Sequence, residues 1–332
     1  MPELPEVETV KNSLKELVIG KTINKIIINY GRIIQTDRTE FQTKLVGQTI
    51  IDIKRKGKYL IFIFPKYLMV SHLRMEGKYF LKAENEEVSK HDHIIFKFTD
   101  HTELRYNDTR KFGVMYLYPQ MELEKLYQMD PLNKLGLEPF DEGFTLDYLK
   151  EKFKNNHRPI KTTLLDQSII SGLGNIYADE VVFMAKLNPN DDTSDLNDED
   201  IVNIITSSKE VLQKAINLGG TTIRSFVNSH AATGLFQNEL LVHTKENCPW
   251  CGLKIKKIFV GGRGTYFCPY CQKKKKTVVA ITGSIATGKS TISALVSQEG
   301  YKVIDLDRIS HQVLKKNTIG YQKVVDAFSS DI

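Results

Sequence analysis

Four cysteines stand in one local array, and they constrain the fold of their segment more than any other feature of the chain. Cys248 and Cys251 form one CxxC turn, and Cys268 and Cys271 form a second after sixteen intervening residues. Two such turns can bring four thiolates together, which is the tetrahedral sulfur set that Zn²⁺ requires. A disulfide pair is the weaker interpretation in a chain with no other cysteine. The array predicts one structural Zn²⁺, which supplies folding energy that so small a unit cannot obtain from a core.

The sequence before residue 135 has the pattern of short strands, and the sequence after it has the pattern of helices. Helical spacing of apolar residues from Val10 to Val18, closed by Gly20, predicts a first helix. Short β-rich runs then predict an all-β sandwich or barrel, with strands at 23–30, 49–53, 59–64, 68–73, 78–82, 93–98, 102–106 and 113–118. Beyond residue 135, helical periodicity predicts a compact helical domain, with helices at 146–153, 160–167, 176–185 and 201–218.

Charge and hydropathy limit the partners and the location of the chain. The net charge of +6 is uneven, because basic residues cluster at 54–58, 254–263 and 273–276. Such patches indicate a polyanionic partner, although a lysine run alone is more often a solvated surface. The sequence has no apolar run of 18 residues and no signal peptide, so we expect no membrane span and a cytoplasmic protein.

The first residues, Met1-Pro2-Glu3-Leu4-Pro5-Glu6, permit chemistry if Met1 is removed. Pro2 would then present a secondary amine with two carboxylates close behind it. An α-amino group has a pKa near ~8 and is partly neutral at pH 7, so it can attack an electrophilic carbon. The alternative interpretation is structural, since proline and glutamate are both favoured at the start of a helix.

A phosphate-binding motif follows the last lysine cluster. A strand is predicted at 277–282, a loop from Gly283 to Ser290 that includes Gly288 and Lys289, a helix at 292–298 and a second strand at 302–305. The segments 281–291 and 303–310 resemble the N-terminal part of dephospho-coenzyme A kinase. A kinase sheet needs further strands, a nucleoside pocket and an acceptor-binding lid, so we expect this partial P-loop α/β fragment to be inactive.

Residues 1–272 closely resemble formamidopyrimidine-DNA glycosylases. The resemblance is carried by the N-terminus, by the segment from Gly172 to Asp179 and by the cysteine array, in that order along the chain. It implies a multidomain α+β protein with an N-terminal β-sandwich, a helix-two-turn-helix domain and a zinc-finger β-hairpin. The expected domains are 1–134, 135–236 and 237–272, followed by a linker and the P-loop fragment at 273–332.

The resemblance also implies catalytic roles for four residues. Pro2 would attack C1′ of a nucleotide bearing an oxidised purine, expelling the base and forming an iminium, while Glu3 handles protons at the sugar. Lys58 matches the family's lysine near the active site. The neighbouring Lys56 could be mistaken for this residue but does not match it. Arg263 would bind phosphates around the lesion and assist the second elimination.

The DNA contacts implied by the resemblance lie in two regions. Met75, Arg110 and Phe112 would fill the space left by an everted base. Lys161 and Asn175 match phosphate-binding positions, and His91 matches a further DNA contact. Residues 222–234 would form a flap over the base.

The expected partner is double-stranded DNA with an oxidised purine or an abasic site, bound by a monomer. Two other classes stay open: a zinc-containing nucleic-acid-binding protein without catalysis, and a nucleotide-dependent transferase led by the phosphate loop.

Overall fold

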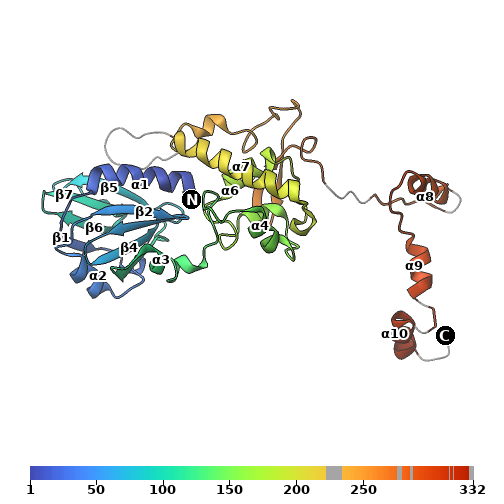
Figure 1. Cartoon of the computed structure of the whole chain (residues 1–332), viewed down its shortest axis with the longest axis horizontal. Helices are drawn as coiled ribbons and strands as arrows, with labels where there is room; N and C mark the ends of the chain where they lie inside the picture. The colour runs from blue at the N-terminus through green and yellow to red at the C-terminus, as the bar shows by residue number, and fades with distance from the viewer. Residues whose placement is uncertain (222–233, 275–278, 285–286, 314, 317, 329–332) are drawn as a thin grey trace. The chain divides into compact units, whose positions relative to one another are not determined.

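The computed structural model describes residues 1–221, 234–274, 279–284, 287–313, 315–316 and 318–328. Its contacts divide the chain into two compact units, 1–276 and 277–332 (Figure 1), and each is described by itself. Within the described residues, no helix is both long enough and apolar enough to cross a membrane.

The N-terminal part of the first unit is a sandwich of two antiparallel four-stranded sheets. One sheet has the order β1-β6-β7-β5 and the other β2-β3-β4-β8. The strands are β1 Ile23–Ile28, β2 Asp52–Lys56, β3 Tyr59–Ile63, β4 Tyr67–His72, β5 Lys78–Ala83, β6 Asp92–Phe98, β7 Thr102–Asn107 and β8 Val114–Pro119. The predicted sandwich is therefore confirmed, and its apolar side chains form one core with those of α1 (Leu4–Val18).

Two helices of this part differ from expectation. α1 begins at Leu4, six residues before the predicted apolar pattern, because Glu3 and Glu6 form a capping box at its N-terminus. α2 (Arg38–Leu45) was not predicted. Only Phe41 and Leu45 of α2 are buried, so its sequence carries almost no apolar periodicity.

The helical part contains the predicted helices with small shifts at their ends. Its members are α4 Leu146–Phe153, α5 Ile160–Leu164, α6 Asn175–Met184 and α7 Asp198–Asn217. The short helix α3 (Leu123–Leu126) precedes this part and packs on the sandwich, where Leu126 is buried with Tyr59 and Ile61. α7 packs against α1, α4 and α6. Leu4 of α1 belongs to this second core, where it lies against Gly172; a Cβ there would meet Leu4 Cδ1 at 2.5 Å. The start of the chain is thus held against the helical part.

The cysteine segment is built on a short antiparallel hairpin, β9 (Lys256–Val260) and β10 (Arg263–Phe267). Gly261 and Gly262 at its turn have φ of 55° and 74°, a conformation that favours glycine. Trp250 stacks on Phe183 of α6, with ring centroids 4.1 Å apart, which fixes the segment to the helical part.

The second unit consists of α8 (Lys289–Gln298), α9 (Leu306–Val313) and α10 (Ile319–Phe328). Its helix after the phosphate loop is confirmed, but the two predicted strands are not formed: residues 279–282 and 302–305 have no strand structure. A strand needs a neighbour to satisfy its backbone groups. No described segment of this unit supplies one, and Val279 stays 76% exposed.

Candidate active site and zinc site

Glu3 is anchored at the N-terminus of α6. Its carboxylate accepts hydrogen bonds from the backbone N–H groups of Gly174 (2.7 Å), Ile176 (3.0 Å) and Tyr177 (3.3 Å). These are free helix-end donors, and the helix dipole favours an anion there. Gly174 allows the approach, because a Cβ at that position would lie 2.3 Å from Glu3 Cδ. The Gly-Leu-Gly-Asn turn therefore serves to receive this carboxylate.

Lys58 and Glu3 form a buried acid–base cluster. Burial raises the pKa of Glu3, an effect that the charge of Lys58 opposes and that of Glu6 reinforces. Burial lowers the pKa of Lys58, although Glu3 and Glu6 oppose this shift. Lys58 Nζ donates to the Leu173 carbonyl at 2.7 Å. The pKa of each group is therefore shifted in the direction that favours its neutral form.

The neighbours of Lys58 are already neutralised. Arg55 pairs with Glu8 and with Glu138, both at 2.8 Å, and Lys56 pairs with Asp141 at 2.8 Å. Lys58 is the member of this basic segment whose charge is coupled to Glu3 and Glu6.

Glu6 is a further member of this cluster, and the sequence did not assign it a role in the site. Its carboxylate accepts from the Glu3 backbone N–H (2.9 Å), from the Tyr177 hydroxyl (2.6 Å) and from the Thr221 backbone N–H (2.8 Å). The three-residue spacing of Glu3 and Glu6 is the available signal, since it is the spacing of a capping box. Glu6 joins the N-terminal residues to α6 and to the residue that precedes segment 222–233.

Pro2 is half-buried and lines a cleft of about 670 Å³ between the sandwich and the helical part. Met75, Glu6 and His243 line the same cleft. With Met1 attached, the Pro2 nitrogen is an amide and cannot act as a nucleophile. The cleft therefore places the nitrogen beside the acid–base cluster, and removal of Met1 decides whether it can react.

The proposed gap-filling residues are exposed apolar and cationic side chains. Met75 is 40% exposed and Phe112 is 52% exposed. The Arg110 guanidinium carbon lies 4.8 Å from the centre of the Phe112 ring, so these two side chains form a cation–π pair. His91 is half-buried, and its backbone carbonyl accepts from Asp108 N at 3.1 Å.

Asp108 shapes the loop that presents Arg110 and Phe112. Its fully buried carboxylate accepts from the backbone N–H groups of Arg110 (2.9 Å), Phe112 (2.8 Å) and Gly113 (2.9 Å). Its carbonyl accepts from His93 Nε2 at 2.8 Å, with the proton placed on that nitrogen. Asp108 thus determines the direction in which the two exposed side chains point.

Lys161 differs from its expected role. Its side chain is fully buried, and Nζ donates to Asp179 Oδ1 and to the Asn175 carbonyl, both at 2.6 Å. It has no surface for a direct phosphate contact in this conformation, because the ion pair with Asp179 holds it inside. Asn175 Nδ2 donates to the Gly264 carbonyl at 3.0 Å, which joins α6 to the hairpin. Lys161 joins α5 to α6 through its bonds to Asn175 and Asp179.

Arg263 is exposed at the start of β10, beside the hairpin turn. Its charge contributes to the lowered pKa of Lys58, after burial as the main cause. The hairpin therefore directs a cation toward the acid–base cluster.

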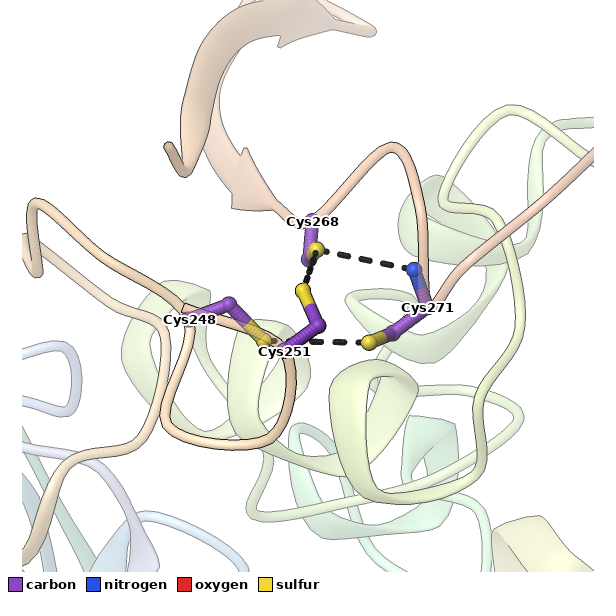
Figure 2. Close-up of side chains that lie close together, drawn as sticks. All are labelled: Cys248, Cys251, Cys268 and Cys271. Carbon is purple, nitrogen blue, oxygen red and sulfur yellow. Dashed lines mark hydrogen bonds between the residues drawn. The ribbon is translucent and has the colours of Figure 1, made fainter. Parts of the chain in front are cut away.

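The four cysteine sulfurs converge as the sequence predicts. All four Sγ atoms lie within 4.8 Å of one another (Figure 2), and the Cys271 backbone N–H donates to Cys268 Sγ at 3.5 Å. Four thiols on two tight turns match the ligand set of a structural zinc ion. Phe183 and Val242 pack around this cluster, so the metal site is continuous with the helical part.

The phosphate-loop residues lie in the second unit. Gly288 has φ of 81° and precedes α8, and Lys289 Nζ donates to the Gly283 carbonyl. Gly283, Gly288 and Ser290 are exposed and Lys289 is half-buried, while residues 285–286 of this loop lie outside the described residues.

Together, the fold and the site define a multidomain zinc-binding protein with an acid–base cluster at its N-terminus. The chain belongs to the formamidopyrimidine-DNA glycosylase family. Residues 1–115 match the family model of the formamidopyrimidine-DNA glycosylase N-terminal domain, 135–227 that of the H2TH domain, and 245–274 that of a zinc finger found in FPG and IleRS. Residues 277–332 match the dephospho-CoA kinase model.

Individual relatives cover the first unit. The chain is 48% identical over 282 residues to a formamidopyrimidine-DNA glycosylase of Oceanobacillus iheyensis, covering 84% of this chain and all of the relative. It is 49% identical over 280 residues to that of Bacillus subtilis, covering 83% and 100%. A Lactococcus lactis Fpg structure with N7-benzyl-Fapy-dG DNA matches with a TM-score of 0.76 at 43% identity, covering 82% of this chain and all of that one. A complex with abasic-site DNA matches equally, at 42% identity.

Proposed function

We propose that this chain is a DNA base-excision repair enzyme that removes oxidised purines, including 8-oxoguanine and formamidopyrimidines, and cleaves the resulting abasic site. The observation that carries this function is that Pro2 lines a cleft together with Glu6, whose carboxylate accepts from the backbone N–H of Glu3. Glu3 follows Pro2 in the chain and is electrostatically coupled to the buried Lys58. The chain's relatives are DNA glycosylases, and structures of a relative contain Fapy-dG or abasic-site DNA.

The proposed reaction begins after removal of Met1. The Pro2 nitrogen attacks C1′ of the damaged nucleotide, the glycosidic bond breaks, and the base leaves with a proton. Glu3, whose pKa is raised by burial, can donate a proton to the sugar as the ring opens to an iminium. The iminium left after base removal acidifies the C2′ hydrogen, so strand cleavage by elimination proceeds from the covalent intermediate that base removal produced.

Two further cations act on the same intermediate. Lys58, whose pKa is lowered by burial, moves protons at the deoxyribose, and Arg263 assists the second elimination at the phosphate. When zinc is bound by the four cysteines, it cross-links the two CxxC turns that support the hairpin.

Duplex DNA reaches this site by base eversion, and the chain fills the gap. Met75 and Phe112 supply apolar wedges, and Arg110 supplies donors for the unpaired cytosine. His91 contacts DNA in the same region. Asn175 contacts phosphate beside the hairpin, where its side chain bonds the Gly264 carbonyl, and the buried Lys161 supports it by donating to the Asn175 carbonyl. Of the expected flap at 222–234, residues 222–233 lie outside the described residues.

We also propose a monomeric enzyme in the cytoplasm, divided at 1–134, 135–236, 237–272 and 273–332. The last segment is proposed to lack kinase activity, because 279–282 and 302–305 form no strands.

Borohydride trapping on a duplex with 8-oxoguanine opposite cytosine tests the proposal. Protein shown by intact mass to begin at Pro2 is expected to form a covalent adduct, and protein that retains Met1 is expected to form none. Lys289→Ala is the matched control and should trap like the parent chain. A zinc protein that only binds nucleic acid would bind this duplex without any adduct, which is the result that contradicts the proposal.

A further inference from the structure

Tyr106 of β7 is a core residue that contacts two loops of the sandwich. Its side chain is fully buried, and its ring meets that of Tyr79 edge-on, with centroids 5.2 Å apart at 64°. The first loop follows β4 and carries Met75, and the second follows β7 and carries Arg110 and Phe112. These three side chains are the gap-filling residues, and they reach the surface from two separate turns of the chain.

Two glycines bring both loops onto the Tyr106 hydroxyl. Gly77 closes the turn that carries Met75, since its N–H donates to the Leu73 carbonyl at 2.9 Å. A Cβ at Gly77 would lie 2.2 Å from Tyr106 Oη, and a Cβ at Gly113, which ends the second loop, would lie 1.6 Å from the same atom. Both backbones therefore pack directly on one oxygen. Packing at this density transmits a displacement of one loop to the other.

The same hydroxyl is bonded to the carboxylate that holds the second loop. Burial raises the pKa of Tyr106, and the charge of Asp108 adds to this shift, so the hydroxyl keeps its proton and is the donor. It donates to Asp108 Oδ2 at 3.4 Å. That oxygen also accepts from the backbone N–H groups of Phe112 and Gly113. The hydroxyl thus contacts the second loop through its backbone and through the carboxylate that shapes it.

We propose that Tyr106 is a positioning residue that couples the two loops, so that Met75 and Phe112 enter the DNA together. The inference rests on the proposed function, because it takes these side chains to fill the gap left by an everted base. A phenylalanine would bury the same ring without desolvating a hydroxyl, so what the hydroxyl adds is its contact with the loops. Removing it leaves a gap between the two glycine backbones, and each loop can then move by itself.

A double-mutant cycle on DNA affinity tests this coupling. The probe is a duplex with a tetrahydrofuran abasic analogue opposite cytosine, which needs no chemistry to bind. Met75→Ala and Phe112→Ala are measured singly and together, in the parent chain and in Tyr106→Phe. In the parent, the combined loss of affinity should be about fivefold smaller than the product of the single losses, whereas in Tyr106→Phe the single losses should multiply. Tyr79→Phe is the matched control: it removes a buried hydroxyl that donates to Ser71 Oγ at 2.7 Å, and it should keep the coupling of the parent.

A coupling of the same size in the parent and in Tyr106→Phe would overturn the inference, as would a parent without coupling. If Tyr106→Phe does not fold, hydrogen exchange in the DNA complex decides. Met75→Ala changes an exposed side chain of the first loop, and it should increase exchange at the Gly113 amide of the second loop about fivefold. Unchanged exchange at Gly113 refutes the coupling.

The proposed function is scored by the parent chain alone. A parent that does not prefer the tetrahydrofuran duplex to an undamaged duplex of the same sequence defeats the proposed glycosylase, and this inference with it. A parent that has this preference but shows no coupling between Met75 and Phe112 defeats only the role of Tyr106.

Discussion

Replacing Asp108 with Asn should release the loop that presents Arg110 and Phe112. The Asp108 carboxylate accepts three backbone hydrogen bonds of 2.8–2.9 Å from Arg110, Phe112 and Gly113. The Asn side-chain oxygen can take the place of Asp108 Oδ2 and keep the bonds from Phe112 and Gly113. Its NH₂ group then faces the Arg110 N–H, and because both are donors this third bond is lost. One hydrogen bond to a charged acceptor is then lost, at about 1.5–3 kcal/mol, and two become neutral, at roughly 0.5 kcal/mol each. The free energy that holds the loop closed should therefore fall by about 3 kcal/mol. Solvent does not weaken these hydrogen bonds, because Asp108 is fully buried.

Hydrogen exchange at the Phe112 and Gly113 amides measures this cost directly, since both are protected by the carboxylate. Asp108→Asn should increase their exchange by about a hundredfold. It should also weaken the preference for cytosine opposite a tetrahydrofuran site, because Arg110 loses its fixed direction. Asp166→Asn is the matched control: this carboxylate accepts from Ser168 N at 3.0 Å in the helical part and should leave the preference unchanged. A loop that exchanges faster while cytosine preference stays intact would refute the link between Asp108 and base recognition.

Three further outcomes follow from the same structure. Chelation of zinc should separate Trp250 from Phe183 and red-shift the emission of this single tryptophan, while circular dichroism of the sandwich persists. Lys161→Met should lower the free energy of unfolding in urea by about 3–5 kcal/mol, since it leaves Asp179 buried without its cation, and adding Asp179→Asn should restore part of the loss. Because burial raises the pKa of Glu3 above 4.5, the native state binds a proton that the unfolded chain has released. The free energy of unfolding should therefore decrease as pH rises from 4.5 to the raised pKa of Glu3 in the folded state. In parallel pH titrations, the Glu3→Gln variant should lose less stability over the same range.

The sandwich and the helical part were predictable because their sequences carry the period of their structure. Short β-rich runs between turn residues along β3 to β8, and the amphipathic pattern of α7, place these elements within a few residues of their observed bounds. α2 was not predictable, since its burial comes from two side chains against β1. The strands expected in the second unit failed for the opposite reason: residues 302–305 have the local pattern of a strand but no described neighbour to pair with.

In the candidate site, too, some features were predictable from sequence and others were not. The cysteines converge as their spacing predicts, because two CxxC turns largely determine where their own sulfurs point. The partners of Lys161 could not be read from sequence, since Asp179 lies one α6 turn beyond Asn175 and reaches Lys161 only through packing of α5 on α6. A buried ion pair and an exposed phosphate ligand use the same residue type, so the sequence pattern does not separate them.

The N-terminal turn of α6 is where the parts of the first unit meet. Its backbone N–H groups hold Glu3, its first residue bonds the Gly264 carbonyl of the hairpin, and Asp179 one turn later accepts from Tyr266 N at 3.3 Å. Each of these bonds fixes a different partner against one rigid helix. The distance between Pro2 and Arg263 is therefore set through α6 and through the metal that holds the hairpin. Zinc bound by the four cysteines would hold the hairpin in position, although no proposed chemical step passes through the metal.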